Sequence, residues 1–176
     1  MKDLLEAIEH DSLAQAKRLL KNGDFNLNCE IEIGTEYDLD EYDEVPLLFW
    51  LIQKNASMDM INLLIEHGLD PHLTTKEGLS GVDIAIKYKR FDVLKMYKDL
   101  GYDFNTTKRK SGLTPLMLAS GFSDIEMMKF FIENGADIKV KDKHGMNALD
   151  YAKKMGQKKA TEFLENLDKE DNKNIE

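Results

Sequence analysis

The sequence contains almost no cysteine, which excludes a fold held together by disulfides. Cys29 is the single cysteine among 176 residues, so no internal disulfide can form. No apolar run approaches the roughly 18 residues that cross a bilayer. The first ten residues, MKDLLEAIEH, carry acidic side chains that the apolar core of a signal peptide would not tolerate. We therefore expect a cytoplasmic protein with no membrane-spanning segment, and we leave its export as a secreted effector open.

The sequence also lacks the patterns that accompany catalysis or a bound cofactor. It contains no Gly-rich phosphate loop, no HExxH pair and no GxSxG turn. The histidines do not stand at metal-ligand spacing; they are His10, His67, His72 and His144. His67 directly precedes Gly68, and a cation is favourable at the end of a helix. We therefore predict a protein that is not an enzyme and holds neither a metal ion nor a cofactor.

Charge is abundant but unevenly distributed along the chain, whose formal net charge is −9. Residues 1–73 contain 5 Lys and Arg against 16 Asp and Glu, whereas residues 74–176 contain 19 against 17, so the two parts carry −11 and +2. An acidic protein is poorly suited to nucleic acid, because such binding depends on the neutralisation of phosphates. The asymmetry predicts a molecule with two differently charged ends.

Corner glycines and helix-start residues recur with a period close to 34. The sequences GLD, GYD and GAD begin at Gly68, Gly101 and Gly135, which are 33 and 34 residues apart. Helix-opening sequences VPL, SGV, TPL and NAL begin at positions 45, 80, 114 and 147, with spacings of 35, 34 and 33. A fixed period of this length indicates stacked copies of one supersecondary unit.

With this period, GLTPLMLA at 112–119 followed by GADI at 135–138 resembles the ankyrin repeat, whose signature is T-P-L-H-x-A. The resemblance implies an all-α solenoid of helix-turn-helix repeats with short finger hairpins. We expect one monomeric domain over residues 1–167, with units at about 1–28, 44–73, 74–107, 108–140 and 141–167. Residues 29–43 are then an insert between units one and two, and residues 168–176 a charged flexible tail.

The local chemistry of unit four supports these boundaries. Thr114 can accept a hydrogen bond from a free backbone N–H, and Pro115 suits the first helical position. Asn147 and Ser80 can cap their helices in the same way. A second helix at 125–133 would end at Gly135 in the left-handed conformation. Apolar side chains lie at helical spacing on one face of it: Ile125, Met128, Phe131 and Ile132.

The chain departs from the ankyrin pattern in two ways. The histidine of T-P-L-H is replaced by Leu48, Asp83, Met117 and Asp150, so its hydrogen bonds to the neighbouring finger are absent or different. In unit two, Trp50 stands where alanine is usual, so either the helices separate there or their register shifts. We expect Trp50 to be buried against the insert, with an exposed contact as the alternative.

The insert is strongly acidic. Residues 29–45, CEIEIGTEYDLDEYDEV, contain eight carboxylates and no Lys or Arg. The alternation in EIEI predicts a short strand that extends a finger hairpin. Three interpretations of the remainder stay open: a solvated loop, a contact for a basic partner through Tyr37 and Tyr42, or a calcium site at Asp38 and Asp40 that lacks the usual glycine and downstream glutamate.

The resemblance implies that finger tips and inner-helix ends contact a partner. The corresponding positions are Lys76, Glu77, Leu79, Lys87 and Tyr88 in unit three, Lys110, Ser111, Leu113, Gly121 and Phe122 in unit four, and Lys143, His144, Met146, Lys154 and Met155 in unit five. Tyr88, Phe122 and Met155 recur 34 and 33 residues apart and are predicted to form an exposed apolar row, with packing between inner helices as the alternative. KRK at 108–110, with Lys139, Lys141 and Lys143, predicts a basic strip along the fingers.

These patterns favour a non-catalytic module that binds a partner protein through its concave face and finger loops, with no role for nucleic acid or membrane. The alternative is an inhibitor or immunity-type protein that blocks a toxin or enzyme with its acidic insert. A regulatory subunit of an enzyme is a third possibility. The identity of the partner does not follow from the sequence.

Overall fold

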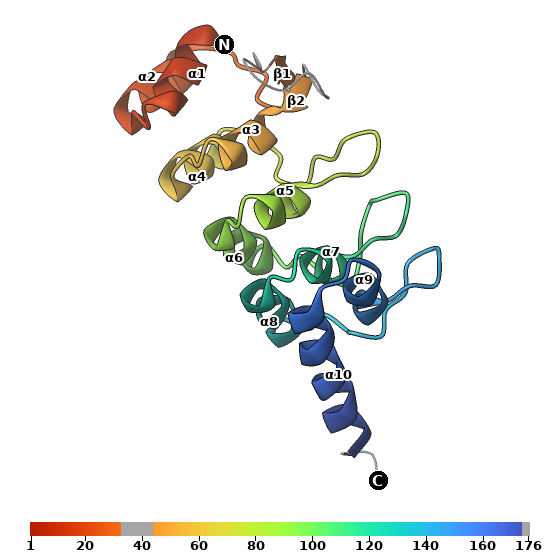
Figure 1. Ribbon diagram of the computed structural model, residues 1–176. Helices are drawn as coiled ribbons and strands as arrows, with labels where there is room; N and C mark the ends of the chain where they lie inside the picture. Colours follow the sequence, from red (N-terminus) through yellow and green to blue (C-terminus); the bar gives the residue numbers. More distant parts are fainter. Residues whose placement is uncertain (33–43, 174–176) are drawn as a thin grey trace.

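The structure, a computed structural model, describes residues 1–32 and 44–173. Within these ranges the chain forms ten helices and two short strands (Figure 1). In chain order these are α1 Lys2–Glu9, α2 Leu13–Asn22, β1 Glu30–Glu32, β2 Glu44–Pro46, α3 Leu47–Gln53, α4 Met58–Glu66, α5 Gly81–Lys87, α6 Phe91–Asp99, α7 Pro115–Gly121, α8 Ile125–Glu133, α9 Ala148–Lys154 and α10 Lys158–Lys173. None of the described helices is both long and apolar enough to cross a membrane.

The helices form helix-turn-helix pairs that stack one on another along the molecule (Figure 1). The first helices of successive pairs pack side by side, α3 against α5, α5 against α7 and α7 against α9, and form an inner row. The second helices lie on the opposite side, and the loops between pairs project beside the inner row as fingers (Figure 1). The predicted all-α repeat solenoid with finger hairpins is therefore confirmed.

A left-handed residue marks the turn inside each helix pair. Positive φ angles between 46° and 68° occur at Asp11, Asn55, Lys89, Ser123 and Gly156. The last four positions are 34, 34 and 33 residues apart, and the first two are 44 apart because the insert lies between them. Residues other than glycine adopt this conformation rarely, so its recurrence shows that the packing of each helix pair imposes the same tight turn.

The predicted caps are present at the starts of α7 and α9. The hydroxyl of Thr114 accepts a hydrogen bond from the N–H of Met117 at 3.4 Å. The side-chain oxygen of Asn147 accepts from the N–H of Asp150 at 3.0 Å, and the Asp150 carboxylate accepts in return from the N–H of Asn147. These bonds satisfy backbone donors that have no partner within the helix.

The ends of the outer helices are also tied from one unit to the next. Gly135 follows α8 with a φ of +89°, as predicted for a left-handed stop. Asn105 of the preceding unit donates to the Gly135 carbonyl at 2.8 Å and accepts from the N–H of Asp137 at 2.7 Å. Asn28 makes the equivalent pair of bonds to unit two. Each asparagine thereby fixes the spacing of two adjacent units.

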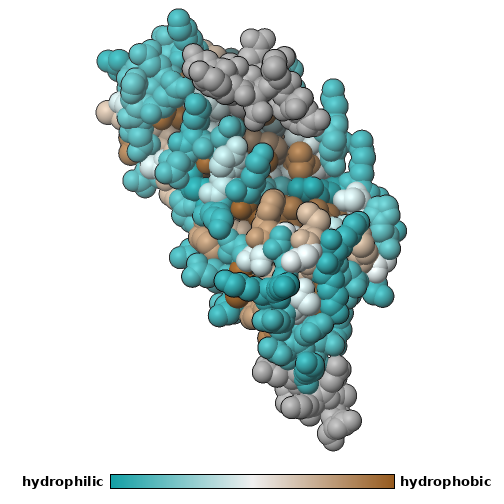
Figure 2. All heavy atoms as spheres, viewed as in Figure 1, coloured by the Kyte–Doolittle hydropathy of each residue, from teal (hydrophilic) through white to brown (hydrophobic). Residues whose placement is uncertain are grey.

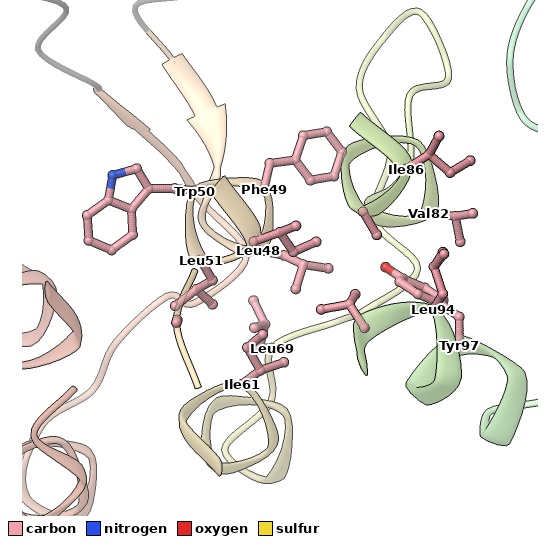
Figure 3. Packing of buried hydrophobic residues seen from close by; sticks show 14 of the residues in the cluster. Leu48, Phe49, Trp50, Leu51, Ile61, Leu69, Val82, Ile86, Leu94 and Tyr97 are labelled. Carbon is pink, nitrogen blue, oxygen red and sulfur yellow. The ribbon is translucent and has the colours of Figure 1, made fainter. Parts of the chain in front are cut away.

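Buried apolar side chains form one continuous cluster through the stack. In α7, Leu116 and Ala119 are buried and Leu118 is half-buried; in α8, Met128 and Phe131 are buried. Figure 3 shows the junction of units two and three, where side chains from both units interdigitate; they include Leu48, Ile61, Leu69, Val82, Leu94 and Tyr97. Each unit contributes one apolar side, and the neighbouring unit covers it.

Trp50 is 5% exposed, as predicted, but it does not join the core between units two and three. Its ring points away from Leu48 and Leu51, toward the N-terminal helices (Figure 3). It lines an open cavity of about 1010 Å³ together with Leu5 of α1 and Ile31 of β1. This cavity lies between the inner helices of units one and two, and α1 and α3 do not pack on each other as α3 and α5 do.

The two ends of the insert pair with each other as antiparallel strands, β1 and β2. In the antiparallel pair of β1 and β2, Ile31 lies opposite Val45, with Glu30 opposite Pro46. The strand predicted from EIEI is thus confirmed over residues 30–32. Tyr37, Tyr42, Asp38 and Asp40 lie outside the described residues, so their possible roles in partner or calcium binding stay predictions.

The C-terminal segment differs from the prediction of a flexible tail at 168–176. Helix α10 continues to Lys173 and is 16 residues long, well beyond the outer helices of the other units. Its first half buries Ala160 and Leu164 against the stack. A helix that is already nucleated by such packing can extend into solvent at little further cost.

Candidate functional site

The predicted apolar row lies at the C-terminal ends of three inner helices. Tyr88, Phe122 and Met155 are the C-cap residues that directly follow α5, α7 and α9, and each directly precedes the left-handed turn residue. They are 38%, 57% and 59% exposed, respectively. Their predicted exposure is therefore confirmed, and packing between the inner helices is excluded. We call Tyr88, Phe122 and Met155 the apolar stripe; its contact with a partner stays a prediction.

Neighbouring residues hold the apolar stripe in place. The Lys87 ammonium lies 5.7 Å from the centroid of the Tyr88 ring, within the range of a cation–π contact. A Cβ atom added to Gly121 would lie 3.9 Å from Cγ of Met155, so Met155 lies beside the end of α7. Figure 2 shows apolar side chains gathered in the middle of this face, around α5 and α7, among hydrophilic ones, with smaller apolar areas elsewhere.

The apolar stripe does not extend into units one and two. The corresponding residues there are His10 and Lys54, which directly follow α1 and α3 as C-caps and are exposed. Both directly precede the left-handed turn residue, as the stripe residues do. The left-handed turn residue thus identifies the equivalent positions in units one and two, which the sequence comparison of units three to five did not cover. Because those positions are polar, the apolar stripe is limited to the C-terminal part of the stack.

The finger tips of units three to five lie side by side. The N–H of Lys110 donates to the Glu77 carbonyl at 3.3 Å, and the N–H of Lys143 donates to the Ser111 carbonyl at 3.0 Å. The predicted contact residues at these tips that are exposed are Lys76, Glu77, Lys110, Lys143 and His144. Ser111, Leu79, Leu113 and Met146 are half-buried, and both leucines pack against the core. The fingers thus present mainly lysine to solvent.

One cation of the predicted basic strip is engaged inside the chain. Nε of Arg109 lies 2.7 Å from Oδ1 of the buried Asp83. Oδ2 of Asp83 accepts from both the hydroxyl and the N–H of Ser80, each at 2.8 Å. The start of α5 therefore relies on a carboxylate, which can accept several charge-assisted bonds at once. This ion pair links two neighbouring units at a position where the repeat signature has histidine.

A second ion pair neutralises a carboxylate near Phe122. Lys89, whose side chain is 72% exposed, lies 3.1 Å from Asp124, whose side chain is 12% exposed. Asp124 also accepts from the N–H of Met127 at 3.1 Å at the start of α8. Such a surface pair contributes only ~0–1 kcal/mol to stability. Because Lys89 neutralises Asp124, this carboxylate does not repel an acidic partner at the inner face.

Sequence reasoning missed the buried arginine that joins units two and three. The Nη2 atom of Arg90 donates to the Ala56 carbonyl at 2.8 Å, and Nη1 donates to the Ile52 carbonyl at 3.4 Å. Its Nε and Nη2 atoms also donate to the two oxygens of Asp92, each at 2.8 Å. The hydrogen bonds from Arg90 hold the pKa of Asp92 below its ordinary value. No local pattern distinguishes this arginine from an exposed one, because its acceptors are carbonyl groups 34 and 38 residues earlier.

A buried carboxylate also organises the finger of unit five. Asp142 accepts from the N–H groups of His144 and Met146 and from the Tyr151 hydroxyl, the last at 2.7 Å. Burial acts to raise the pKa of Asp142, but these hydrogen bonds outweigh it and hold the pKa below its ordinary value. Burial and the bond to Asp142 raise the pKa of Tyr151 to about 12. Both groups therefore keep their ordinary charge at neutral pH and serve the structure of the finger.

The exposed side chains on this face are mainly apolar groups and lysines. Within residues 1–32 and 44–173, His, Cys, Asp and Glu side chains form no group of three that could hold a metal ion. His67, as expected, serves a helix end, because its Nδ1 lies 2.8 Å from the Leu63 carbonyl. The face offers apolar area, exposed ammonium groups and finger loops.

Comparison with known proteins identifies relatives of the same repeat type. A family model described as ankyrin repeats, in three copies, matches residues 82–175. One ankyrin repeat protein of Fowlpox virus (strain NVSL) is 22% identical over 135 residues, which are 77% of this chain and 28% of that protein. A second is 26% identical over 150 residues, or 85% of this chain and 72% of that protein. The human ankyrin repeat and SOCS box protein 6 is 28% identical over 158 residues, or 81% of this chain and 37% of that protein. The chain thus spans less than two thirds of two of these relatives.

Proposed function

Because the chain belongs to the ankyrin repeat family, whose repeats are generally protein-interaction modules and typically not enzymes, we propose that it binds a partner protein through the inner face of units three to five. The contact is centred on the apolar stripe. The finger-tip lysines Lys76, Lys110 and Lys143 are exposed on the same three units and meet the periphery of the partner.

The observation that carries this proposal is the placement of exposed apolar side chains. Among the described residues, five large apolar side chains are exposed, and three of them fall at one repeated position on adjacent units. Scattered exposed apolar residues are ordinary on a protein surface, but three at the same position of successive packed units offer apolar area on one side of the stack that a partner can bury. The remaining two, Met1 and Leu100, lie in α1's N-terminal cap and at the end of the outer helix α6.

The two kinds of side chain have different roles in this contact. Burial of the apolar stripe supplies most of the affinity, because aromatic anchors near the centre of an interface carry most of the binding energy. The lysines act mainly on the association rate, because they are exposed and their long-range field is screened by salt. We therefore expect Phe122→Ala to cost about 1–3 kcal/mol of binding free energy. We expect Lys110→Glu to weaken binding more at low salt than at high salt.

Affinity capture from the cell of origin, followed by titration calorimetry of the captured partner, tests the proposal. Phe122→Ala should lose the partner and keep its thermal midpoint, because the side chain is exposed in the free protein. Leu100→Ala is the matched control, since Leu100 is 46% exposed but lies at the end of an outer helix. A partner that binds Phe122→Ala and the unaltered protein equally would refute the role of the stripe.

The acidic insert supplies the competing outcome. If the chain is instead an inhibitor that blocks a basic site with its insert, Tyr37→Ala combined with Tyr42→Ala should abolish binding and Phe122→Ala should leave it intact. The same titrations therefore separate the two hypotheses.

A further inference from the structure

We propose that unit one, residues 1–28, is hinged to the rest of the stack along its outer side and rotates there as a rigid body, which widens and narrows the cavity beside Trp50. Unit one lies at the N-terminal end of the stack, away from the proposed binding face of units three to five (Figure 1). It is attached to unit two through the outer helices, whereas the inner helices of the two units do not pack on each other.

The inner side of this junction lacks the helix packing that joins the later units. Helices α3 and α5, α5 and α7, and α7 and α9 pack side by side, whereas α1 and α3 do not. Between α1 and α3 lies the open cavity of about 1010 Å³, whose lining includes Leu5, Ile31 and Trp50. A displacement of α1 relative to α3 therefore breaks no close packing between these two helices.

The attachments of unit one lie at the outer helices, where α2 packs against α4. At the start of α4, the Ser57 hydroxyl donates to Oδ1 of Asp11 at 2.7 Å. Beyond the end of α4, the Asn28 side chain donates to the Gly68 carbonyl at 2.9 Å and accepts from the N–H of Asp70 at 2.7 Å. Among the described residues, these are the side-chain hydrogen bonds between units one and two, and they lie at the two ends of one helix.

Attachment at both ends of a single helix restricts some motions of unit one much more than others. A shift along α4, or a tilt that lifts one of its ends, stretches the bonds of Asp11 or of Asn28 directly. Rotation about the line that joins these two attachments changes their lengths least, and it moves α1 toward or away from α3. A few residues at element ends can absorb such a hinge motion while the bodies on either side stay intact.

The two bodies on either side of the hinge are each held together internally. In unit one, α1 packs on α2, and Leu4, Ala7 and Ile8 of α1 are buried. On the other side, β2 packs on α3 and β1 pairs with β2, so the hairpin belongs with unit two. Since each unit of a stacked repeat contacts only its neighbours, unit one can rotate without disturbing units three to five.

The lining of the cavity favours neither full closure nor full opening. Closure would bury more of the apolar side chains of Leu5 and Trp50, which is favourable. Closure would also remove charged side chains from water, which is unfavourable unless each finds a partner. The exposed ionisable residues of the lining are Lys2, Glu6, Glu9, His10, Glu30 and Lys54. Apolar burial and charge hydration thus oppose each other across the hinge.

Two pairs of spin labels at matched positions test this inference, both in a Cys29→Ser background. His10→Cys with Tyr88→Cys spans the junction of units one and two, whereas Lys54→Cys with Phe122→Cys spans only junctions whose inner helices pack. All four positions are exposed C-caps directly before a left-handed turn residue, and the members of each pair are two units apart. Double electron–electron resonance should give a broader distance distribution for the first pair than for the second.

Removal of one attachment should increase the motion. Asn28→Ala should broaden the distribution of the first pair further, with circular dichroism unchanged. Asn105→Ala is the matched control, because Asn105 makes the equivalent bonds between units three and four, at 2.8 and 2.7 Å, where α5 and α7 also pack. It should leave the distribution of the second pair unchanged.

Three results would overturn the hinge. The first is equal widths for the two labelled pairs, and the second is an Asn28→Ala variant whose distribution is no broader than that of its parent. The third is broadening accompanied by a loss of helical dichroism, because unit one would then unfold rather than rotate as a body.

Discussion

Replacement of Arg90 by alanine should destabilise the protein and uncouple its N-terminal units from the rest. The side chain of Arg90 is 8% exposed and connects unit three to the carbonyl groups of Ile52 and Ala56 in unit two. Alanine removes the donors and leaves the buried carbonyl of Ala56 without this partner. In a repeat protein, stability is a sum of unit terms and interface terms, so the loss falls on the interface between units two and three.

The magnitude follows from the contacts that are lost. A hydrogen bond from a charged group contributes about 1.5–3 kcal/mol, and the 2.8 Å bond to Ala56 is counted in full. The 3.4 Å bond to Ile52 is weaker. The pair with Asp92 adds little, because that carboxylate is 46% exposed and solvent screens the interaction. The free energy of unfolding should therefore fall by about 2–4 kcal/mol for Arg90→Ala.

Urea denaturation can follow the two parts of the chain separately. Trp50 is the only tryptophan, so its fluorescence reports on unit two, whereas circular dichroism reports on all helices. In Arg90→Ala the fluorescence midpoint should move to lower urea than the dichroism midpoint. Lys89→Ala is the control, because it removes the solvent-exposed partner of one ion pair and no contact between units two and three, and it should cost less than about 1 kcal/mol. A loss below about 0.5 kcal/mol for Arg90→Ala, the scale of ordinary surface substitutions, would refute the reasoning.

Three further predictions concern the repeat backbone, pH dependence and metal content. Gly135→Val should lower the free energy of unfolding by roughly 1 kcal/mol or more, because φ at this position is +89° and a β-branched residue resists it. Gly121→Ala is the control, because Gly121 is helical and an added Cβ would meet only Cγ of Met155, at the ordinary contact distance of 3.9 Å; equal urea midpoints for the two variants would contradict the argument. Because the folded-state pKa of Asp142 is lowered, its contribution to stability is present above the unfolded-state value of about 4 and is lost as pH falls through the folded-state value. Thermal midpoints of Asp142→Asn should therefore be lower than those of the unaltered protein at pH 7 and change less between pH 5 and pH 2; parallel pH curves would show that Asp142 does not titrate as argued. Metal analysis of the purified protein should find no stoichiometric ion, and one zinc or calcium per chain would require a site that includes the acidic insert.

The repeat itself could be predicted from the sequence because its signals are local. The cap at Thr114, the cap at Asn147 and the left-handed Gly135 each depend on the residue and its immediate neighbours along the chain. A backbone N–H at a helix start needs an acceptor nearby, and a positive φ favours glycine, whatever lies elsewhere in the fold. The same period placed Phe122 at a helix end beside a tight turn, where a side chain has little to cover it.

Only the tertiary structure decided two features: the links between units and the extent of the candidate face. Arg90 is buried and Arg109 is paired with Asp83 because their partners lie 26 to 38 residues away along the chain and become neighbours only when units stack. The cavity that Trp50 lines between units one and two likewise depends on how two helices far apart in the chain are placed. Residues 168–173 form helix because α10 is already packed on the stack, although their composition is that of a solvated tail. Local chemistry specifies each unit, whereas burial and charge pairing between units depend on which side chains the stack brings together.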